Sequence, residues 1–578
     1  ICAYSQNKLD EAYAIFKEYL PPDQTELTSA ILQASYYFGE LSLDRGAYDD
    51  AERSFMKIKT FYEAEGLNES PDFAALLISL ARIYHEKNAW DKADEFYGAA
   101  QRIYEAIPDA GIAYFRLLNA RAINFQKMHK PEKAEELLAM IPEDALKGEL
   151  AAIILSNKAL TSKVNNDLVA AETFYREALS HLNKADPSER ILYSETSQNL
   201  AVVLGEKDQV AEALSLLTEV EDLLKTDTKR LAALLVKKGI VLLKTDDETA
   251  ALKAFNEALV LVNKANTEYS SDWVMAMNGI GSSYTIEGNI ESADSVFSII
   301  LSSYRDKGIE KDANYPIVLN NYASVQQMKG QFHSAYGLFF QAAQYLKEET
   351  GVNTLVYATT LDNLAHVNIN RGMLTVARGQ IDSAIAIIDK ILGPESLQYA
   401  SAQVTRGRLH QNAGDFPAAE PCFKKAYSLL AQLKDVPLGQ IVRATNALAI
   451  FYQTMGNYEE AEPLFREVLS RIEKHGSTAT SDYSTTLQNL ATLYQIQGNL
   501  SQASELLEKT LAIDEKVFGT NHPQYIIALK NLGVLYQKQG KLADAQRLLE
   551  RALEVTRNVH GVVHPSYAVT VRNLAALY

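Results

Sequence analysis

The sequence predicts an all-α fold, a solenoid of stacked antiparallel helix pairs. An alanine recurs every 42 residues through the second half of the chain, and another small residue precedes each alanine by 12 residues. The alanines are Ala251, Ala293, Ala335, Ala377, Ala419, Ala461, Ala503 and Ala545, and the small residues are Gly239, Gly281, Ala323, Ala365, Gly407, Ala449, Ala491 and Gly533. A constant period of about 20 to 50 residues is typical of stacked repeats.

Each repeat has the apolar pattern of two helices joined by a tight turn. Between Tyr525 and Gly540, apolar residues fall at helical spacing, and Gly540 is a suitable residue to follow the end of a helix. The next helix has an apolar stripe formed by Leu542, Ala545, Leu548, Leu549, Ala552 and Leu553. Pro565 then suits the first turn of another helix, where its missing N–H costs little. The period therefore corresponds to one helix pair.

Small residues at two fixed positions predict that the helices of a pair cross closely. A bulky side chain at either position would push the helices apart. A large residue follows each alanine by four positions and is expected to fill the space between neighbouring pairs. These large residues are Phe255, Phe297, Phe339, Ile381, Phe423, Phe465, Leu507 and Leu549.

The same register continues upstream, although the connections there vary in length. The corresponding alanines are Ala12, Ala51, Ala93, Ala134, Ala171 and Ala213, and a small residue precedes each from Ala51 onward by 12 positions. We therefore expect 13 complete helix pairs with a partial unit at each end. The array divides into an irregular part, residues 1–230, and a regular part, residues 231–578.

The repeat resembles the tetratricopeptide repeat (TPR), whose usual unit has about 34 residues. The 42-residue unit is similar to the kinesin light chain type through Asn489-Leu490-Ala491, Ala461-Glu462 and the segment Gly519-Thr520-Asn521-His522-Pro523. The resemblance implies a right-handed superhelix with a concave face that binds a peptide or a protein.

Composition restricts the class of partner. The chain has 578 residues, 47% of them hydrophobic, and a net charge of −17. Such acidity opposes binding to nucleic acid or to anionic membranes, which need basic faces. No run of apolar residues is long enough for a transmembrane helix. We therefore expect a protein or peptide partner, with no nucleic acid partner and no direct membrane insertion.

The sequence contains no motif that would make the chain an enzyme, bind a cofactor or hold a metal. It lacks a phosphate-binding loop, a zinc-protease motif and a Cys-x-x-Cys motif. His522 and His564 are expected to cap loops rather than bind a metal, and Cys422 is expected to be a buried, inert thiol. No catalytic residue, metal ligand or cofactor is predicted.

A column of asparagines is the first candidate for partner binding. An asparagine recurs two positions before the small residue, at Asn157, Asn199, Asn321, Asn363, Asn489, Asn531 and Asn573. The TPR resemblance implies that this position faces the concave side, where an amide can both donate to and accept from a peptide backbone. The alternative is that these asparagines bond locally within the stack.

Glutamines and basic residues extend the candidate face. The glutamines, six positions after the asparagine position, are Gln327, Gln411, Gln453, Gln495 and Gln537, and the basic residues are Arg408, Arg443, Lys530 and Arg572. On an acidic protein, a local basic strip indicates a partner with an acidic segment. The alternative is that these cations only solvate a helix face.

Two functional hypotheses follow. The first is a protein–protein interaction scaffold that holds its partner in the concave groove. The second is a regulatory arm of a larger protein whose catalytic domain, such as a caspase-like CHAT protease, lies outside this chain.

Overall fold

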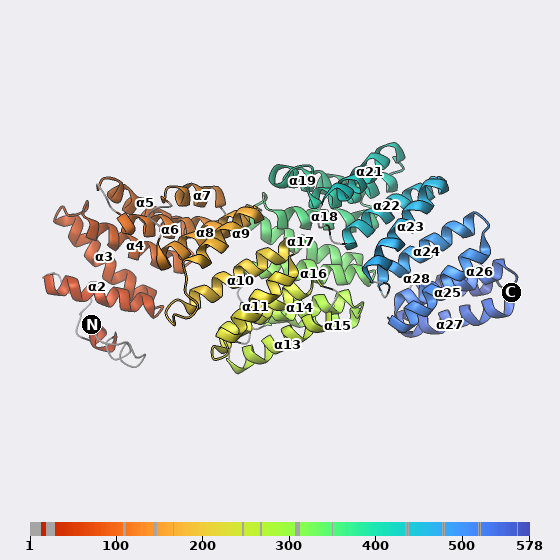
Figure 1. The fold of residues 1–578 in the computed structure, drawn as a ribbon, viewed down its shortest axis with the longest axis horizontal. Coiled ribbons are helices and arrows are strands. Elements are labelled where there is room, and N and C mark those ends of the chain that lie inside the picture. Colours follow the sequence, from red (N-terminus) through yellow and green to blue (C-terminus); the bar gives the residue numbers. More distant parts are fainter. Residues whose placement is uncertain are drawn as a thin grey trace. The chain divides into compact units, whose positions relative to one another are not determined.

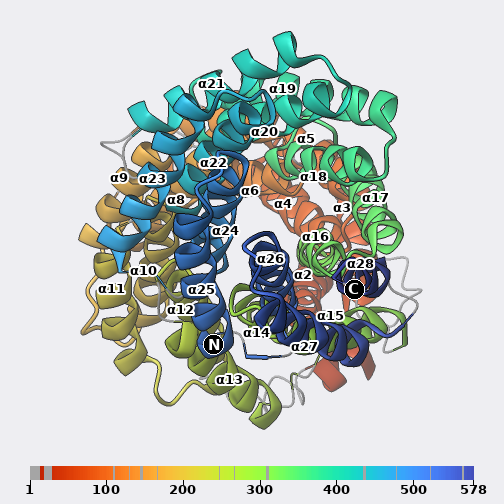
Figure 2. The ribbon, with the colours of Figure 1, turned by 90° about the vertical axis from the view of Figure 1, so that its right-hand side faces the viewer.

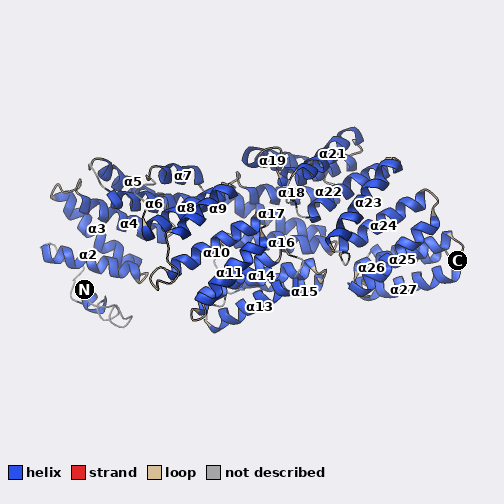
Figure 3. Cartoon of the chain, viewed as in Figure 1, coloured by secondary structure: helices blue, strands red, loops and turns tan. Residues whose placement is uncertain are grey.

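The computed structural model consists of helices joined by short connections, and its described residues contain no strand (Figures 1 and 3). It describes residues 13–18, 29–107, 111–128, 130–142, 147–165, 167–207, 209–245, 248–265, 267, 269–306, 312–349, 351–433, 436, 438–476, 478, 480–517, 519–520, 522–562 and 565–577. Cys2, Ala12 and His564 lie outside these residues. The chain divides by its contacts into two compact units, Ile1–Val203 and Leu204–Tyr578.

The first unit contains helices of unequal length. They are α2 (Ser29–Asp44), α3 (Tyr48–Ala64), α4 (Pro71–Glu86), α5 (Trp90–Glu105), α6 (Gly111–Lys127), α7 (Pro131–Ala139), α8 (Gly148–Val164), α9 (Leu168–Ser180) and most of α10 (Arg190–Glu206). Helices α7 and α9 are the shortest of them. The sequence predicts a boundary at residue 230 between irregular and regular repeats. The two units are defined by contacts instead, so the boundary at residue 230 stays a prediction.

The second unit contains the regular repeats. Its helices are α11 (Val210–Leu223), α12 (Thr228–Leu242), α13 (Glu248–Lys264), α14 (Ser271–Ile286), α15 (Ile290–Asp306), α16 (Asn314–Met328), α17 (Phe332–Glu349), α18 (Leu355–Asn370), α19 (Leu374–Leu392), α20 (Leu397–Asn412), α21 (Phe416–Gln432), α22 (Leu438–Thr454), α23 (Tyr458–His475), α24 (Ser481–Ile496), α25 (Leu500–Val517), α26 (Pro523–Lys538), α27 (Leu542–His560) and α28 (Pro565–Ala575).

The predicted all-α solenoid of helix pairs is confirmed. Of the 13 expected pairs, twelve lie within one unit and are in contact, α2–α3 to α8–α9 in the first unit and α12–α13 to α26–α27 in the second. Helix α28 begins at Pro565 as expected. Gly540 has a φ of 77°, and the equivalent Gly498 has a φ of 82°. Glycine adopts this left-handed conformation without the steric cost that a Cβ would impose, so the tight turn recurs with the repeat.

The small residue of each pair makes room for the large residue of the same pair. A Cβ added to Gly281 would lie 2.7 Å from the Phe297 ring, and one added to Gly407 would lie 2.8 Å from the Phe423 ring. Phe297 and Phe423 are almost completely buried. The large residue also reaches the next pair, because a Cβ on Gly279 of α14 would lie 2.3 Å from the Phe255 ring. This contact joins the helices within a pair and links adjacent pairs.

We predict that Ala503→Leu lowers the stability of the second unit. Ala503 is fully buried on α25, so the added side chain must displace close-packed neighbours at a cost of about 1–3 kcal/mol. The measurement is the midpoint of thermal unfolding by circular dichroism. Gln502→Leu places the same leucine side chain at the exposed neighbouring position, where nothing has to move, and is expected to leave the midpoint unchanged. An unchanged midpoint for Ala503→Leu would refute the close-packing argument.

A buried carboxyl group interrupts the apolar core of α25. Asp514 is fully buried, and neither of its oxygens has a hydrogen-bond partner that meets normal geometry within the described residues. The equivalent positions of the adjacent repeats are Ile472 and Thr556. Burial raises the pKa of Asp514 to about 6, against which the nearby Ser484 hydroxyl acts only weakly.

We predict that Asp514 makes folding less favourable as the pH rises from about 4 to 6. The pKa of Asp514 is 3.8 unperturbed and about 6 in the folded chain, so the folded state binds more protons within this window. At about 1.4 kcal/mol per pKa unit, the loss approaches ~3 kcal/mol above pH 6. Urea unfolding of the wild type and of Asp514→Leu between pH 4 and pH 8 measures this difference. A difference in stability that does not change with pH would contradict the assignment.

Candidate partner-binding face

The two helices of each pair lie on different sides of the second unit. The first helix carries the small residue and the second helix carries the repeated alanine. First helices contact one another from pair to pair, as α18 contacts α20 and α20 contacts α22. Figure 2 shows the first helices α18, α20, α22 and α24 toward the inside of the unit and the second helices α19, α21 and α23 toward the outside.

The first helix α24 leaves a single stripe accessible to solvent. Between residues 482 and 496 the accessible residues are Asp482, Thr485, Asn489, Thr492, Gln495 and Ile496, and the others are buried. Their spacing of three and four residues places them on one face of the helix. We define the inner face as this side of the first helices α14, α16, α18, α20, α22, α24, α26 and α28. The predicted asparagine and glutamine columns lie on it.

Some asparagines of the column bond within the stack. Asn321 of α16 donates from Nδ2 to Asn278 Oδ1 of α14 at 3.0 Å, and Asn531 of α26 donates to Gln488 Oε1 of α24 at 3.3 Å. In the first unit, Asn157 likewise donates to Asn119 Oδ1 at 2.8 Å. These amides link consecutive first helices, which is the local role that the sequence left open.

Other asparagines of the column have no such bond. No hydrogen bond of the side chains of Asn363, Asn489 or Asn573 is recorded among the described residues, and all three are partly exposed. The column is therefore divided between residues that join helices and residues whose amides face solvent. Only the second group has both its donor and its acceptor available to a partner.

The glutamine column shows a similar division. Gln327 Nε2 lies 2.6 Å from His366 Nδ1, and Gln537 Nε2 donates to the Ala576 carbonyl at 2.7 Å. Gln411 makes a longer contact of 3.5 Å with Thr454 Oγ1. Each of these reaches from one first helix to the next. For Gln453 and Gln495 no side-chain hydrogen bond is recorded within the described part of the chain, and both are partly exposed.

The four basic candidates have different surroundings. Arg408 donates from Nη1 to His366 Nε2 at 2.9 Å, and burial followed by the charge of Arg443 lowers the pKa of Arg408. Arg443 is exposed, donates from Nε to the Gly439 carbonyl of its own helix at 3.3 Å, and its charge acts on Asp482 of α24. Lys530 is half-buried, donates to Ser566 Oγ at 3.1 Å and has its pKa lowered by burial. Arg572 is exposed on α28. Only Arg408 and Arg443 are therefore brought together.

Acidic residues that directly follow the repeated alanine join neighbouring repeats. Glu462, next to Ala461, accepts from the Tyr494 hydroxyl of the following first helix at 2.8 Å. Burial acts to raise the pKa of Glu462, but hydrogen bonds from Tyr494 and Arg466 outweigh it and the pKa is lowered. Asp294 accepts in the same way from Gln326 and Lys329. The repeated Ala-Glu and Ala-Asp pairs in the sequence could have predicted these links between repeats. They were not among the predicted contacts.

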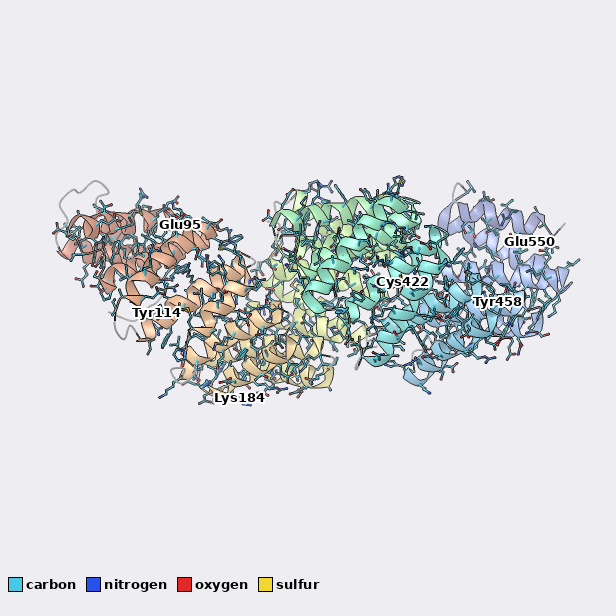
Figure 4. The ribbon with its side chains drawn as sticks, turned by 90° about the horizontal axis from the view of Figure 1, so that it is seen from above. Glu95, Tyr114, Lys184, Cys422, Tyr458 and Glu550 are labelled. Carbon is cyan, nitrogen blue, oxygen red and sulfur yellow. The ribbon has the colours of Figure 1, made fainter. Side chains whose placement is uncertain are left out.

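The remaining chemical candidates are structural in the described residues. His522 precedes α26 and accepts at Nδ1 from the Gln524 N–H at 3.2 Å, so its predicted capping role is confirmed. Cys422 lies on the second helix α21 (Figure 4), half-buried, and burial raises the pKa of its thiol. The described residues contain no group of His, Cys, Asp and Glu placed to hold a metal, and no described helix is long and apolar enough to cross a membrane.

Comparison with known families agrees with this geometry. Models described as tetratricopeptide repeat match residues 76–105, 356–432, 440–516, 482–558 and 526–578. The chain contains tetratricopeptide repeats. Such repeats serve in general as scaffolds for protein–protein interaction. No curated protein matches the chain as a relative.

The chain is similar to solved structures at low sequence identity. The chain is similar to the APC/C hetero-tetramer Cut9-Hcn1, with 14% identity over 94% of this chain and 96% of that chain and a TM-score of 0.50. The repeats of a Podosopora anserina protein designated a kinesin light chain are 24% identical over 35% of this chain and 96% of that chain, with a TM-score of 0.31. BtubC (BKLC) from P. vanneervenii is 21% identical over 36% of this chain and 83% of that chain, with a TM-score of 0.33.

We predict that two asparagines of one column contribute differently to stability. Asn321→Ala removes a bond to Asn278 and is expected to lower the unfolding free energy by about 0.5–1.5 kcal/mol. Asn489→Ala removes no recorded bond and is expected to change it by less than ~0.5 kcal/mol. Urea unfolding of both variants tests the division. Equal losses of stability would show that Asn489 also joins helices.

Proposed function

We propose that the inner face of the second unit binds a segment of a partner protein and that the chain acts as an interaction scaffold. The observation that carries this proposal is the accessible stripe of the first helices, which is clearest on α24. In α24 it presents the amides of Asn489 and Gln495, the hydroxyls of Thr485 and Thr492, and the aliphatic Ile496. Amides at regular rise can pair with the main chain of an extended segment whatever its side chains are.

The charge of the inner face supports an acidic segment in the partner. The whole chain carries a net charge of −17, yet the α20–α22 part of the inner face presents Arg408 and Arg443. A basic strip on an acidic protein attracts an acidic segment and disfavours basic ones. The proposal is the same whether the chain is a free scaffold or the arm of a larger protein with a catalytic domain.

Exposed aliphatic residues would add affinity to this polar recognition. Ile450 of α22, Ile496 of α24 and Ile527 of α26 are 37%, 52% and 38% exposed. Ile450 and Ile496 lie on the same stripe as the amides, at positions one and five residues after the small residue. Covering such side chains contributes about 25 cal/mol per Å² of apolar surface removed from water. A segment that combines acidic and aliphatic residues fits the face best.

We predict that changing the inner face abolishes partner recovery without unfolding the chain. The variant combines Asn363→Ala, Asn489→Ala and Arg443→Gln, none of which removes a recorded contact between helices. We expect its recovery of the partner from extracts of the source cells to fall at least ~10-fold, the equivalent of about 1.4 kcal/mol of binding free energy. Quantitative mass spectrometry of the co-purified proteins is the measurement.

The matched control is Lys425→Gln, which removes a positive charge from an exposed position of the outer helix α21. It is expected to recover the partner as the wild type does. If the inner-face variant recovers the same proteins in the same amounts, the inner face is not the binding surface. Circular dichroism of each variant establishes that the chain is folded.

A further inference from the structure

On the inner face of α18, α20 and α22, some positions carry residues that differ from those at the equivalent positions of the other repeats. The asparagine position is occupied by Thr405 in α20 and Ala447 in α22, and the column resumes at Asn489. Ionisable residues appear in the same region at positions where other repeats have neutral ones. His366 and Arg408 occupy the position that is Ser324, Ile450 and Thr492 in other repeats. Stacking therefore does not require these charges.

Asp362 is the second residue that differs from its equivalents in the other repeats. Its equivalents Asn320 and Asn446 donate to the next first helix, Asn320 to Thr360 Oγ1 and Asn446 to Thr486 Oγ1, both at 2.9 Å. A carboxylate has no N–H and cannot make this bond. The Oδ1 atom of Asp362 is shielded from solvent and lacks a hydrogen-bond partner among the described residues. Departures from a repeat rule that cost stability are expected at functional sites.

The two arginines form a positively charged cluster without an ion pair. Arg408 donates to His366, an imidazole whose pKa is lowered to about 4, first by burial and then by the charges of Arg408 and Arg443. The imidazole is therefore neutral at pH 7 and brings no negative charge. Within the described residues, no carboxylate lies within ion-pair distance of the guanidinium of Arg408 or Arg443. Two such guanidinium groups attract an oxyanion.

Asp362 supplies the only negative charge that acts on Arg408 within the cluster. The groups that act on Asp362 are the Thr405 hydroxyl and Arg408 on α20 and Arg443 on α22. Burial nevertheless dominates and raises the pKa of Asp362 to about 6. The carboxylate therefore neutralises the arginines only partly, and it loses its charge close to neutral pH.

We propose that Asp362, His366, Arg408 and Arg443 form a binding site for a carboxylate of the partner, with the Asp362 carboxylate as an internal competitor. The site refines the proposed function and rests on it. His366 holds the Arg408 guanidinium in place, and the exposed Arg443 provides the second donor. When the charge of Asp362 is removed, Arg408 loses its internal counter-charge. Arg443, in contrast, keeps the attraction of Asp482 on α24. The cluster then binds the external carboxylate more tightly.

The direction of the pH dependence follows from the same geometry. A bound carboxylate is a like charge beside Asp362, so binding favours the protonated form of Asp362. The complex therefore takes up protons, and affinity rises as the pH falls from 8 toward 6. Glutamate side chains, with an ordinary pKa of about 4.3, stay charged throughout this range. The change in affinity consequently reports on the protein rather than on the ligand.

The experiment measures binding of fluorescein-labelled hexaglutamate by fluorescence anisotropy at constant ionic strength. For the wild type we expect affinity about 5-fold higher at pH 6 than at pH 8, which one pKa unit of coupling produces from a pKa of about 6 in the free chain. Asp362→Asn is expected to bind at pH 8 at least as tightly as the wild type binds at pH 6, with no dependence on pH. Arg443→Gln is expected to lose binding at both pH values.

The control is Asp382→Asn, which removes a carboxylate of α19 that pairs with Arg406 at 3.4 Å, away from the cluster. It is expected to behave as the wild type. Calorimetry of the wild type in two buffers of different ionisation enthalpy measures proton uptake directly and needs no variant. Uptake of protons on binding supports the proposal, and binding without proton uptake overturns the role of Asp362.

Two outcomes separate this site from the broader function. If hexaglutamate binds equally at both pH values, or if Asp362→Asn keeps the wild-type dependence, Asp362 is not a competitor. If hexaglutamate does not bind at any pH, the carboxylate site is refuted. Neither result changes the recovery of the natural partner by the inner face, which the co-purification experiment measures independently.

Discussion

The structure depends on the contact between a large side chain on each second helix and a small residue 16 positions earlier on the first helix. At Gly281 and Phe297, the ring occupies the space that a Cβ would need. This contact sets the separation of the two helices, so the 12-residue offset survives where connections vary. Because the same ring can reach the next pair, as Phe255 reaches Gly279, it also transmits the arrangement from pair to pair.

The same packing determines which surface is left for function. Burial of the rest of α24 leaves one stripe, which runs from Asp482 to Ile496. Polar residues on it are close enough to the preceding and following first helices to bond with them. Asn321 does so and Asn489 does not, so one column contributes to stability in one repeat and remains available for binding in another.

Sequence periodicity was sufficient to predict the fold. The helix pairs, the left-handed glycines of the regular repeats, such as Gly498 and Gly540, and the cap at His522 all depend on residues close together in the chain. Periodicity also predicted that the asparagines share one face of the first helices, which is the inner face in the second unit. It could not separate Asn321 from Asn489, because a bond to the preceding helix depends on residues about 40 positions away. The links from Glu462 to Tyr494 and from Arg408 to His366 are of the same kind.

The most direct test of the account is photo-crosslinking from single sites while the natural partner is bound. A crosslinking amino acid would replace Thr492, which is exposed on the inner face of α24, or Glu505, which is exposed on the second helix α25. The account predicts a crosslinked partner from position 492 and none from position 505. Crosslinking from position 505 alone would contradict it and would place the binding surface on the outer helices.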